Sequence, residues 1–348
     1  MPRRFASSFQ RPILSRLSQL AATSLLLALT AGAQAQTAGS SSVQLYGLID
    51  AAVGSFKDTG GARSTQVSSG NLTTSYFGFK GREDLGGGLY SFFALESYFR
   101  GDTGEGARYT GDSLYSRAAF VGLGSDIGAL RLGRVGTPLF TNTLVYNPLA
   151  SSFAFSPSIR NIFGAGARVA GDSGWNNAVA YTSPTVAGLT ANLIYGMREA
   201  AQGANVSAAL QYTAGAFSVG LVGQQVKVPF KSGEETTWQI GSYYDFSVVK
   251  LFGQYTRVSE TATATTTANT RDNVAQLGVS VPLGAGALLA SWSEARTSGS
   301  VAYDRSFTTV GYDYRLSKRT DVYAMAMTDK RSDLSRGNSV GIGMRHVF

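Results

Sequence analysis

The sequence of 348 residues contains no cysteine and a single histidine, His346, close to its C-terminal end. Without cysteine, disulfides, thiolate metal sites and cysteine nucleophiles are excluded. One histidine near the chain end also leaves no usual way to build a serine nucleophile with a histidine base, or a metal site of several histidines. The residues therefore favour neither an enzyme nor a protein that holds a metal or another cofactor.

Charged residues are scarce as well, because Asp, Glu, Lys and Arg make up only 15% of the chain. Soluble globular proteins contain roughly 25%. Yet the mean hydropathy is -0.01, and the two longest uncharged stretches, 135–159 and 200–226, are interrupted by proline, glycine and amide side chains. The composition therefore excludes both an ordinary soluble domain and a bundle of membrane-spanning helices.

Residues 1–35 are predicted to be a cleaved export signal. Four arginines precede an apolar stretch at 20–31, and Ala33-Gln34-Ala35 follows as a small-x-small cleavage sequence. The apolar stretch is shorter than the roughly 20 residues that span a bilayer as a helix. Removing four arginines from a formal net charge of +8 leaves about +4 on residues 36–348, which is too weak and too evenly spread to indicate nucleic-acid binding.

What the sequence does contain is alternation with a period of two residues. At 251–258, 75–81 and 287–295, apolar or small side chains alternate with polar ones. Such alternation is typical of strands that have one apolar and one polar face. It also explains the mean hydropathy near zero, since only every second residue has to be apolar.

Short and long connections separate these predicted strands in turn. The short ones are 84–88, 125–128, 184–188, 213–215, 282–286 and 316–319, and the long polar ones are 57–67, 101–111, 228–235 and 260–271. Outer-membrane barrels have short periplasmic turns and longer outer loops. At about 40 residues per hairpin, residues 36–348 give about sixteen strands, so we predict an all-β, 16-stranded antiparallel transmembrane barrel.

The C-terminal segment reads as a last strand. Val340, Ile342, Met344, His346 and Phe348 share one face of it, which we expect to contact lipid, with His346 at the level of the headgroups. A terminal phenylalanine on such a strand resembles the signal by which the barrel-assembly machinery recognises its clients. Phe348 is therefore the predicted assembly signal.

Taken together, the motifs resemble the general porins of Gram-negative bacteria, of the beta-proteobacterial type. The resemblance extends over essentially the whole of 36–348, and the segments that carry it are 42–50, 77–89, 95–97, 117–123, 132–134 and 343–348. It implies a homotrimer in the cell outer membrane, in contact with its lipid and lipopolysaccharide. It also implies that each barrel has its own pore, narrowed by an infolded third loop.

The candidate third loop is 136–172. A connection of this length is often functional. General porins often carry carboxylates on this loop, whereas this chain has no acidic residue from 127 to 171. The loop is apolar instead, with Leu139, Phe140, Leu144, Phe153, Phe155 and Phe163. We expect these side chains to hold the loop against the inner wall, and the alternative is an aromatic track for a substrate.

Alternation assigns charged residues of the strands to the inner face. If Phe77 and Phe79 face lipid, then Lys80 and Arg82 face the lumen. A charge that faced lipid at the middle of the bilayer would cost about 2–4 kcal/mol, which supports inward assignments in general.

The same reasoning extends to the next strands. Outward positions for Ala118 and Phe120 would place Arg117 inward, and Arg131 lies between two leucines that are expected to face lipid. Arg134 breaks the alternation, so we place it where the strand passes into the third loop. There, a change of direction would turn it into the pore.

The predicted pore lining is therefore mostly basic. Rings of arginine or lysine favour anions by raising their local concentration. The alternative is that the arginines only support the third loop through hydrogen bonds to its carbonyl groups, and both roles can coexist. The predicted set is Asp50, Lys80, Arg82, Glu96, Arg117, Arg131, Arg134, Arg160 and Arg168.

The sequence thus predicts a channel for passive diffusion of ions and small hydrophilic solutes, with a weak to moderate anion preference. The main alternative is a substrate-specific uptake channel for a small anionic nutrient, with the aromatic third loop as its track. An outer-membrane enzyme is disfavoured because the single histidine, His346, lies at the end of the chain. A barrel plugged by its own loops is disfavoured because no insert of sufficient size is present.

Overall fold

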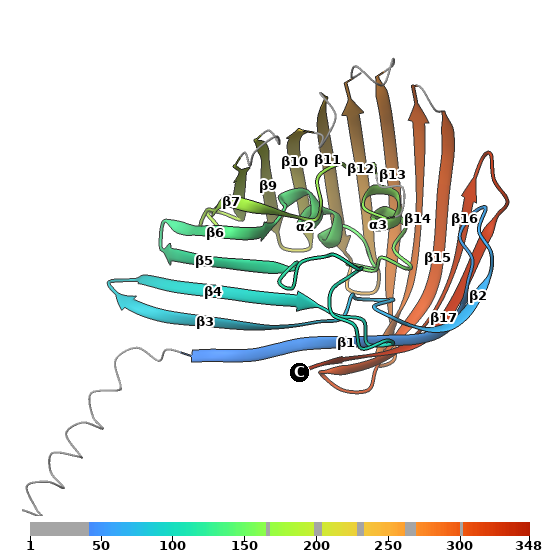
Figure 1. Cartoon of the computed structure of the whole chain (residues 1–348), viewed down its shortest axis with the longest axis horizontal. Helices are drawn as coiled ribbons and strands as arrows, with labels where there is room; N and C mark the ends of the chain where they lie inside the picture. Colours follow the sequence, from blue (N-terminus) through green and yellow to red (C-terminus); the bar gives the residue numbers. More distant parts are fainter. Residues whose placement is uncertain (1–41, 165–167, 198–203, 228–232, 262–268, 300–301) are drawn as a thin grey trace, which may run out of the picture.

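The computed structural model describes residues 42–164, 168–197, 204–227, 233–261, 269–299 and 302–348 (Figure 1). The predicted export signal, 1–35, lies outside the described residues.

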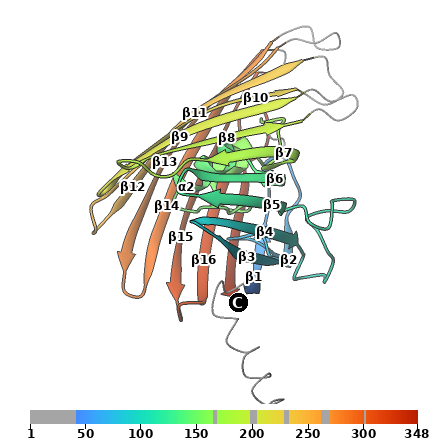
Figure 2. The ribbon, with the colours of Figure 1, turned by 90° about the vertical axis from the view of Figure 1, so that its left-hand side faces the viewer.

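The described residues form one antiparallel sheet of 17 β-segments that closes on itself (Figures 1 and 2). Closure is made by β1 and β17, which pair from Leu48↔Val347 to Ser55↔Val340. The segments are β1 Ser42–Phe56, β2 Ser64–Ser69, β3 Tyr76–Gly86, β4 Leu89–Tyr98, β5 Ala118–Ser125, β6 Gly128–Gly136, β7 Gly174–Thr182, β8 Leu189–Gly196, β9 Asn205–Ala214, β10 Phe217–Lys227, β11 Glu234–Asp245, β12 Lys250–Glu260, β13 Thr270–Leu283, β14 Gly286–Ser298, β15 Tyr303–Arg315, β16 Thr320–Arg331 and β17 Gly337–Val347.

Two of these segments share one place in the barrel wall. Residues 64–69 of β2 pair with the second half of β1, and β3 pairs with its first half along the same edge. An excursion of the chain at 70–75 separates them. The wall is therefore sixteen strands around, and the predicted 16-stranded antiparallel barrel is confirmed.

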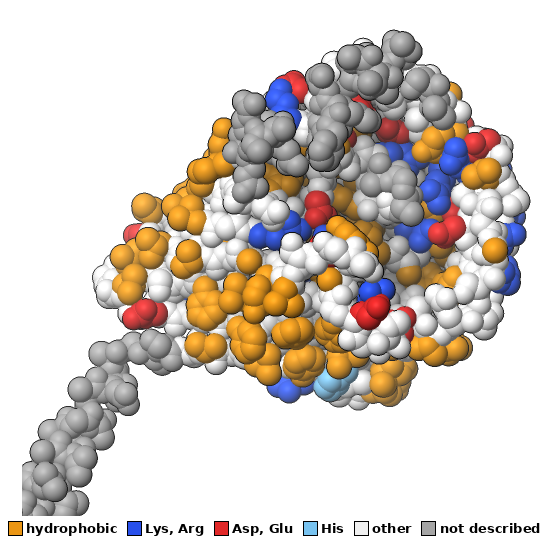
Figure 3. Space-filling model, in the orientation of Figure 1, with side chains coloured by type: hydrophobic (Ala, Val, Ile, Leu, Met, Phe, Trp, Pro, Cys, Tyr) orange, Lys and Arg blue, Asp and Glu red, His pale blue; other side chains and the backbone are white. Residues whose placement is uncertain are grey.

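The outer surface of the barrel is apolar along every second strand position. Ile49, Leu221, Leu277, Val310 and Ile342 are among its exposed side chains. Figure 3 shows hydrophobic side chains gathered as a continuous patch in the lower part of that face. Such a band suits lipid, because the closed ladder leaves no strand edge whose N–H and C=O groups would need water.

Short turns lie at one end of the barrel and long connections at the other (Figure 2). Only two residues join β3 to β4, β5 to β6 and β13 to β14, whereas residues 99–117 join β4 to β5. We refer to the two ends as the short-turn end and the long-loop end.

The connection between β6 and β7 folds into the barrel as two short helices (Figure 1). α2, Pro138–Val145, begins at Thr137, whose hydroxyl accepts a hydrogen bond from the amide of Phe140, and α3, Pro157–Ile162, begins in the same way at Ser156. In both helices proline occupies the first turn, where its missing N–H costs nothing. No helix of the described residues is long and apolar enough to cross a membrane.

This third loop covers part of the inner wall. α2 packs on β8–β11 and α3 on β13–β15. The Tyr146 ring fits over Gly220 and Gly241, where an added Cβ would lie 2.6 and 2.5 Å from ring atoms. Gln239 of the wall accepts a hydrogen bond from Asn142 at 2.8 Å. Apolar packing and buried amide contacts together fix the loop inside the barrel.

The apolar side chains of the loop divide into two groups. Leu139 and Phe155 are fully buried against the wall, as expected of side chains that hold the loop in place. Phe140, Phe153 and Phe163 are only half-buried, and the Phe140 ring contacts those of Phe153 and Phe163, with ring centroids 6.2 and 5.1 Å apart, respectively. The third loop therefore carries an aromatic cluster on a partly exposed side.

Candidate pore lining

The third loop covers the inner faces of β8–β11 and β13–β15, so the inner faces of β1, β3 and β4 are left toward the lumen. Lys80 and Arg82 of β3 are both exposed there. The Lys80 ammonium lies 4.4 Å from the centroid of the Tyr46 ring, and the Arg82 guanidinium carbon lies 3.4 Å from that of Tyr90. Among the described residues, no carboxylate forms an ion pair with either cation. Their positive charges therefore face the lumen without being neutralised.

Glu96 and Arg117, by contrast, neutralise each other. Glu96 points inward from β4, accepts a hydrogen bond from the Tyr46 hydroxyl and lies 3.3 Å from Nε of Arg117. The Arg117 guanidinium also lies 4.0 Å from the centroid of the Tyr76 ring. Tyr76 thus supports an arginine at this part of the wall.

The facing predicted for β5 was wrong. Ala118 is buried and Phe120 packs inside the barrel, 5.9 Å from the Phe92 ring, while Val121 and Leu123 are exposed on the outer surface. The sequence misled because both faces of this short strand are apolar, so alternation alone does not tell them apart. Arg117 precedes the strand, so the alternation of β5 does not fix its direction, and its side chain reaches the Tyr76 ring.

Arg134 lies at the long-loop end of β6, next to a β-bulge between Gly133 and Val135. Its guanidinium donates to the Ser116 carbonyl at 2.5 Å, to Asn176 at 2.8 Å and to Asp172 at 2.9 Å. The bulge is the break in alternation that the sequence indicated.

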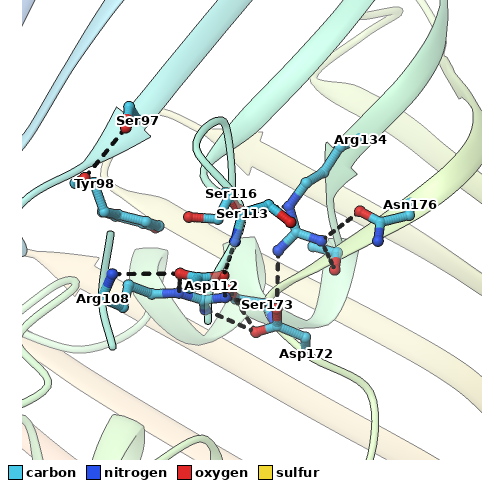
Figure 4. Close-up of polar contacts among 11 residues, drawn as sticks. Ser97, Tyr98, Arg108, Asp112, Ser113, Ser116, Arg134, Asp172, Ser173 and Asn176 are labelled. Carbon is cyan, nitrogen blue, oxygen red and sulfur yellow. Dashed lines mark hydrogen bonds and ion pairs between the residues drawn. The ribbon is translucent and has the colours of Figure 1, made fainter. Parts of the chain in front are cut away.

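Asp172 joins Arg134 to a second arginine, Arg108, from the connection between β4 and β5 (Figure 4). Arg108 donates to both oxygens of Asp172, at 3.1 and 3.2 Å, and its Nε donates to Asp112 at 2.8 Å. We call these four residues, Arg108, Asp112, Arg134 and Asp172, the loop latch. It joins the connection 99–117 to the end of the third loop.

The two carboxylates of the loop latch are held in their ionised form. Burial raises the pKa of Asp112, but the hydrogen bond from Arg108 outweighs it and brings the pKa to about 2. For Asp172, burial is likewise outweighed by the hydrogen bond from Arg108, and its pKa lies below the ordinary value. The loop latch is therefore charged at neutral pH.

Arg160 and Arg168 support the third loop from inside. Arg160 of α3 pairs with Asp58 at 2.5 Å and approaches the carbonyls of Phe153 and Ala154 at 3.4 Å. Arg168, only 8% exposed, pairs with Asp272 at 2.9 Å and donates to the Asn161 carbonyl at 2.8 Å. Both arginines bond loop carbonyls, as the supporting role requires.

Asp50 points inward but does not line the pore, which corrects the prediction. It is 0% exposed, and its carboxylate accepts hydrogen bonds from the amides of Asn71, Leu72 and Thr73 and from the Tyr323 hydroxyl. The physical reason is the excursion at 70–75, which turns three N–H groups toward β1 and seals the carboxylate. Alternation along β1 could not reveal this cover.

Arg131 lies on the inner face of β6, as alternation predicted. Its guanidinium donates to the Thr182 hydroxyl at 3.0 Å, and no carboxylate of the described residues pairs with it. It lines a cavity of about 440 Å³ between α2 and the wall of β4–β9. Arg131 therefore belongs with Lys80 and Arg82 as a cation without a counter-charge.

The predicted basic set thus divides into cations without counter-charge and arginines with one. The counter-charges Asp58, Asp172 and Asp272 were not among the predicted residues. Asp172 could have been noticed, because it directly ends the stretch without acidic residues. Asp58 and Asp272 carry no such signal, since they come from distant parts of the chain.

Phe348 and His346 lie where barrel closure ends. The amides of Gly47 and Phe348 each donate to the other's carbonyl at 3.1 Å. His346 is exposed, and its Nδ1 lies 2.9 Å from the Thr320 hydroxyl.

A closed sixteen-stranded barrel, with an apolar outer band and an inner loop facing charged wall residues, defines an outer-membrane channel protein. The model of the Gram-negative porin family matches residues 21–334, and the chain belongs to this family. It is therefore an outer-membrane porin.

Comparison with individual proteins agrees with this assignment. The chain is 28% identical to outer membrane porin protein 32 of Delftia acidovorans over 340 residues, which cover 93% of this chain and 92% of that protein. It is 26% identical to an outer membrane porin protein of Bordetella pertussis, with 94% and 99% covered. Among solved structures, the anion-selective porin from Comamonas acidovorans superimposes with a TM-score of 0.76 and 26% identity, covering 88% and 100%.

Proposed function

We propose that this porin passes ions and small hydrophilic solutes by passive diffusion, with a weak to moderate preference for anions. The observation that supports the anion preference is a difference in ion pairing between the inward cations and the inward carboxylate. Lys80, Arg82 and Arg131 face the lumen side without an ion pair among the described residues, whereas the inward Glu96 is neutralised by Arg117. An excess of fixed positive charge concentrates anions in a channel.

The similar protein from Comamonas acidovorans is described as an anion-selective porin, which supports the same sign of selectivity here. The paired arginines Arg117, Arg134, Arg160 and Arg168 contribute less in this proposal, because their counter-charges cancel most of their field. Arg134, Arg160 and Arg168 keep the third loop in place and so set the width of the passage, whereas Arg117 neutralises Glu96 on the wall. The proposal contains no catalytic step and no cofactor.

The test is the reversal potential of single channels in a planar bilayer across a KCl gradient. We expect stepwise conductance and a reversal potential of the sign that a chloride-selective channel gives in this gradient. A potential of the opposite sign would overturn the anion preference. Complete absence of conductance from folded protein would overturn the channel itself.

A substrate-specific uptake channel for a small anionic nutrient is the second candidate. The specific observation in its favour is the cavity of about 440 Å³ that Arg131 lines. A diffusion channel shows flux proportional to solute concentration, whereas a specific channel saturates. Liposome swelling at increasing concentrations of organic anions separates the two.

We also propose three partners for the barrel. One is a pair of identical chains in a homotrimer, as the family resemblance implies, which cross-linking in membranes tests. Another is the barrel-assembly machinery, through Phe348. The third is lipopolysaccharide, supported by Arg257, Arg271 and Arg296, which are exposed on the outer faces of β12, β13 and β14 near the long-loop end. Arginines at this height suit lipid phosphates.

A further inference from the structure

A row of cations and rings crosses four strands of the inner wall. Register places Arg82 of β3 opposite Phe92 of β4, Phe92 opposite Gly122 of β5, and Gly122 opposite Arg131 of β6. Adjacent strands lie about 4.8 Å apart, so the two arginine backbones are separated by roughly 14 Å. Along this row, only Phe92 and Gly122 lie between them.

The glycines let the rings lie across β5. An added Cβ at Gly122 would come within 2.6 Å of the Phe92 ring, and one at Gly124 would collide with the Tyr90 ring. The two rings contact each other, with centroids 5.7 Å apart, and Phe92 contacts Phe120 at 5.9 Å. We call Tyr90, Phe92 and Phe120 the aromatic floor.

The aromatic floor is one side of the cavity of about 440 Å³, and α2 covers the cavity with Thr141, Asn142 and Val145. Arg131 also lines the cavity, and its guanidinium carbon is 5.8 Å from the centroid of the Phe120 ring. The guanidinium has five N–H donors, of which the hydroxyl of Thr182 takes one. Donors for a planar anion therefore remain beside the aromatic floor.

We propose that this cavity binds a small aromatic carboxylate, with its ring on the aromatic floor and its carboxylate on the Arg131 guanidinium. The proposal rests on the proposed channel function and specifies a solute class for it. Guanidinium and carboxylate form paired, charge-assisted hydrogen bonds. Offset or edge-to-face ring contacts add stabilisation that an inorganic anion does not receive. The volume lies within the range of about 300–1,000 Å³ usual for small-molecule sites.

The arrangement selects against two other kinds of solute. Chloride and phosphate gain nothing from the aromatic floor and would leave its apolar surface in contact with water. A neutral aromatic compound would leave the Arg131 charge without a partner. Only a molecule with both a ring and a negative charge satisfies the two sides of the cavity at once.

The experiment measures block of the KCl current by benzoate, with acetate and benzyl alcohol as controls that lack the ring and the charge, respectively. We expect benzoate to reduce the current at a half-blocking concentration at least about tenfold lower than acetate, with no block by benzyl alcohol. Arg131→Gln is expected to raise the half-blocking concentration of benzoate about tenfold or more. Phe92→Leu, which leaves Tyr90 and Phe120 in place, is expected to reduce the difference between benzoate and acetate.

Arg336→Gln is the matched control, because it removes one exposed arginine from the connection between β16 and β17 and leaves the cavity intact. Its benzoate block should equal that of the unmodified protein. Equal block by benzoate and acetate, or unchanged benzoate block in Arg131→Gln, overturns the proposal.

The two proposals fail in different ways. If the channel is anion-selective but benzoate blocks it no better than acetate does, only the proposed aromatic carboxylate site is overturned. Should the protein conduct no current, equilibrium dialysis of labelled benzoate against folded protein in detergent decides the site independently. In that assay, binding that Arg131→Gln weakens about tenfold supports the site, and no binding overturns it.

Discussion

Gly47 and Phe348 are joined by a reciprocal pair of backbone hydrogen bonds, each 3.1 Å long. The Phe348 ring lies over Gly47, since an added Cβ there would come within 2.5 Å of it. The last residue of the chain is thus part of the ladder that closes the barrel. If Phe348 is the assembly signal, recognition by the assembly machinery and closure of the barrel depend on the same residue.

Deletion of Phe348 is expected to lower the amount of folded barrel in the outer membrane several-fold. It removes both closing hydrogen bonds and the terminal ring. The measurement is the heat-dependent shift in gel mobility of membrane fractions, with Leu334→Ala in an exposed loop as control. Normal yield without Phe348 would contradict its role as assembly signal.

Selectivity should depend on the unpaired cations more than on the paired ones. The double variant Lys80→Gln/Arg82→Gln is expected to shift the KCl reversal potential toward that of a cation-selective channel, because each substitution removes a positive charge from the lumen. Arg257→Gln removes the same kind of charge from the outer surface and should leave the potential unchanged. An unchanged potential in the double variant would show that other groups set the selectivity.

The loop latch should respond to acid. The pKa of Asp112 is about 2 and that of Asp172 is lowered, both through Arg108. Lowered folded-state values mean that the ionised carboxylates contribute stability above about pH 4, and that this contribution is lost as pH falls toward 2. Open-channel noise should therefore stay constant from pH 8 to about pH 4 and rise below it.

Asp172→Asn tests the same group at neutral pH. It removes the charge that Arg108 and Arg134 share, so the noise of the open channel should rise at about pH 7 to the level of the unmodified protein in acid. The control is Asp102→Asn, on the same long connection but outside the loop latch. If the open-channel noise of Asp172→Asn equals that of the unmodified protein at about pH 7, the loops are held by other contacts.

Asp50 is predicted to stabilise the barrel and not to set selectivity. Asp50→Ala leaves three amides and the Tyr323 hydroxyl without their acceptor, so it should lower the free energy of unfolding by about 3 kcal/mol or more. Tyr323→Phe removes one of these bonds and should cost about 1 kcal/mol. Denaturant unfolding in detergent measures both, and equal costs would contradict the assignment.

Lipopolysaccharide binding should depend on the outer arginines. Replacing Arg257, Arg271 and Arg296 together by Gln is expected to reduce co-purified lipopolysaccharide several-fold, because their charges suit its phosphates. Replacing the inner Lys80 and Arg82 leaves the outer surface unaltered and serves as control. Undiminished lipid in the triple variant would place the contact elsewhere.

Much of this molecule could be predicted from the chain. Alternation in β3, β6 and β17 assigned the inward positions of Lys80, Arg82 and Arg131 and the outward face that ends at Phe348, because successive side chains of a strand point to opposite faces. Alternation failed at β5, where both faces are apolar. It also could not foresee that 70–75 seals Asp50.

Periodicity and connection length along the chain are enough to specify the barrel, its strand number, its apolar outer band and the place of the third loop. They do not specify which cations are neutralised, because that depends on the folded barrel. Asp58 reaches Arg160 and Asp272 reaches Arg168 across roughly a hundred residues of sequence. Coulomb attraction depends on distance in space, and closure of the barrel brings these residues together. The register of the neighbouring strands β4, β5 and β6 sets Arg131 beside the aromatic floor, without a carboxylate partner among the described residues.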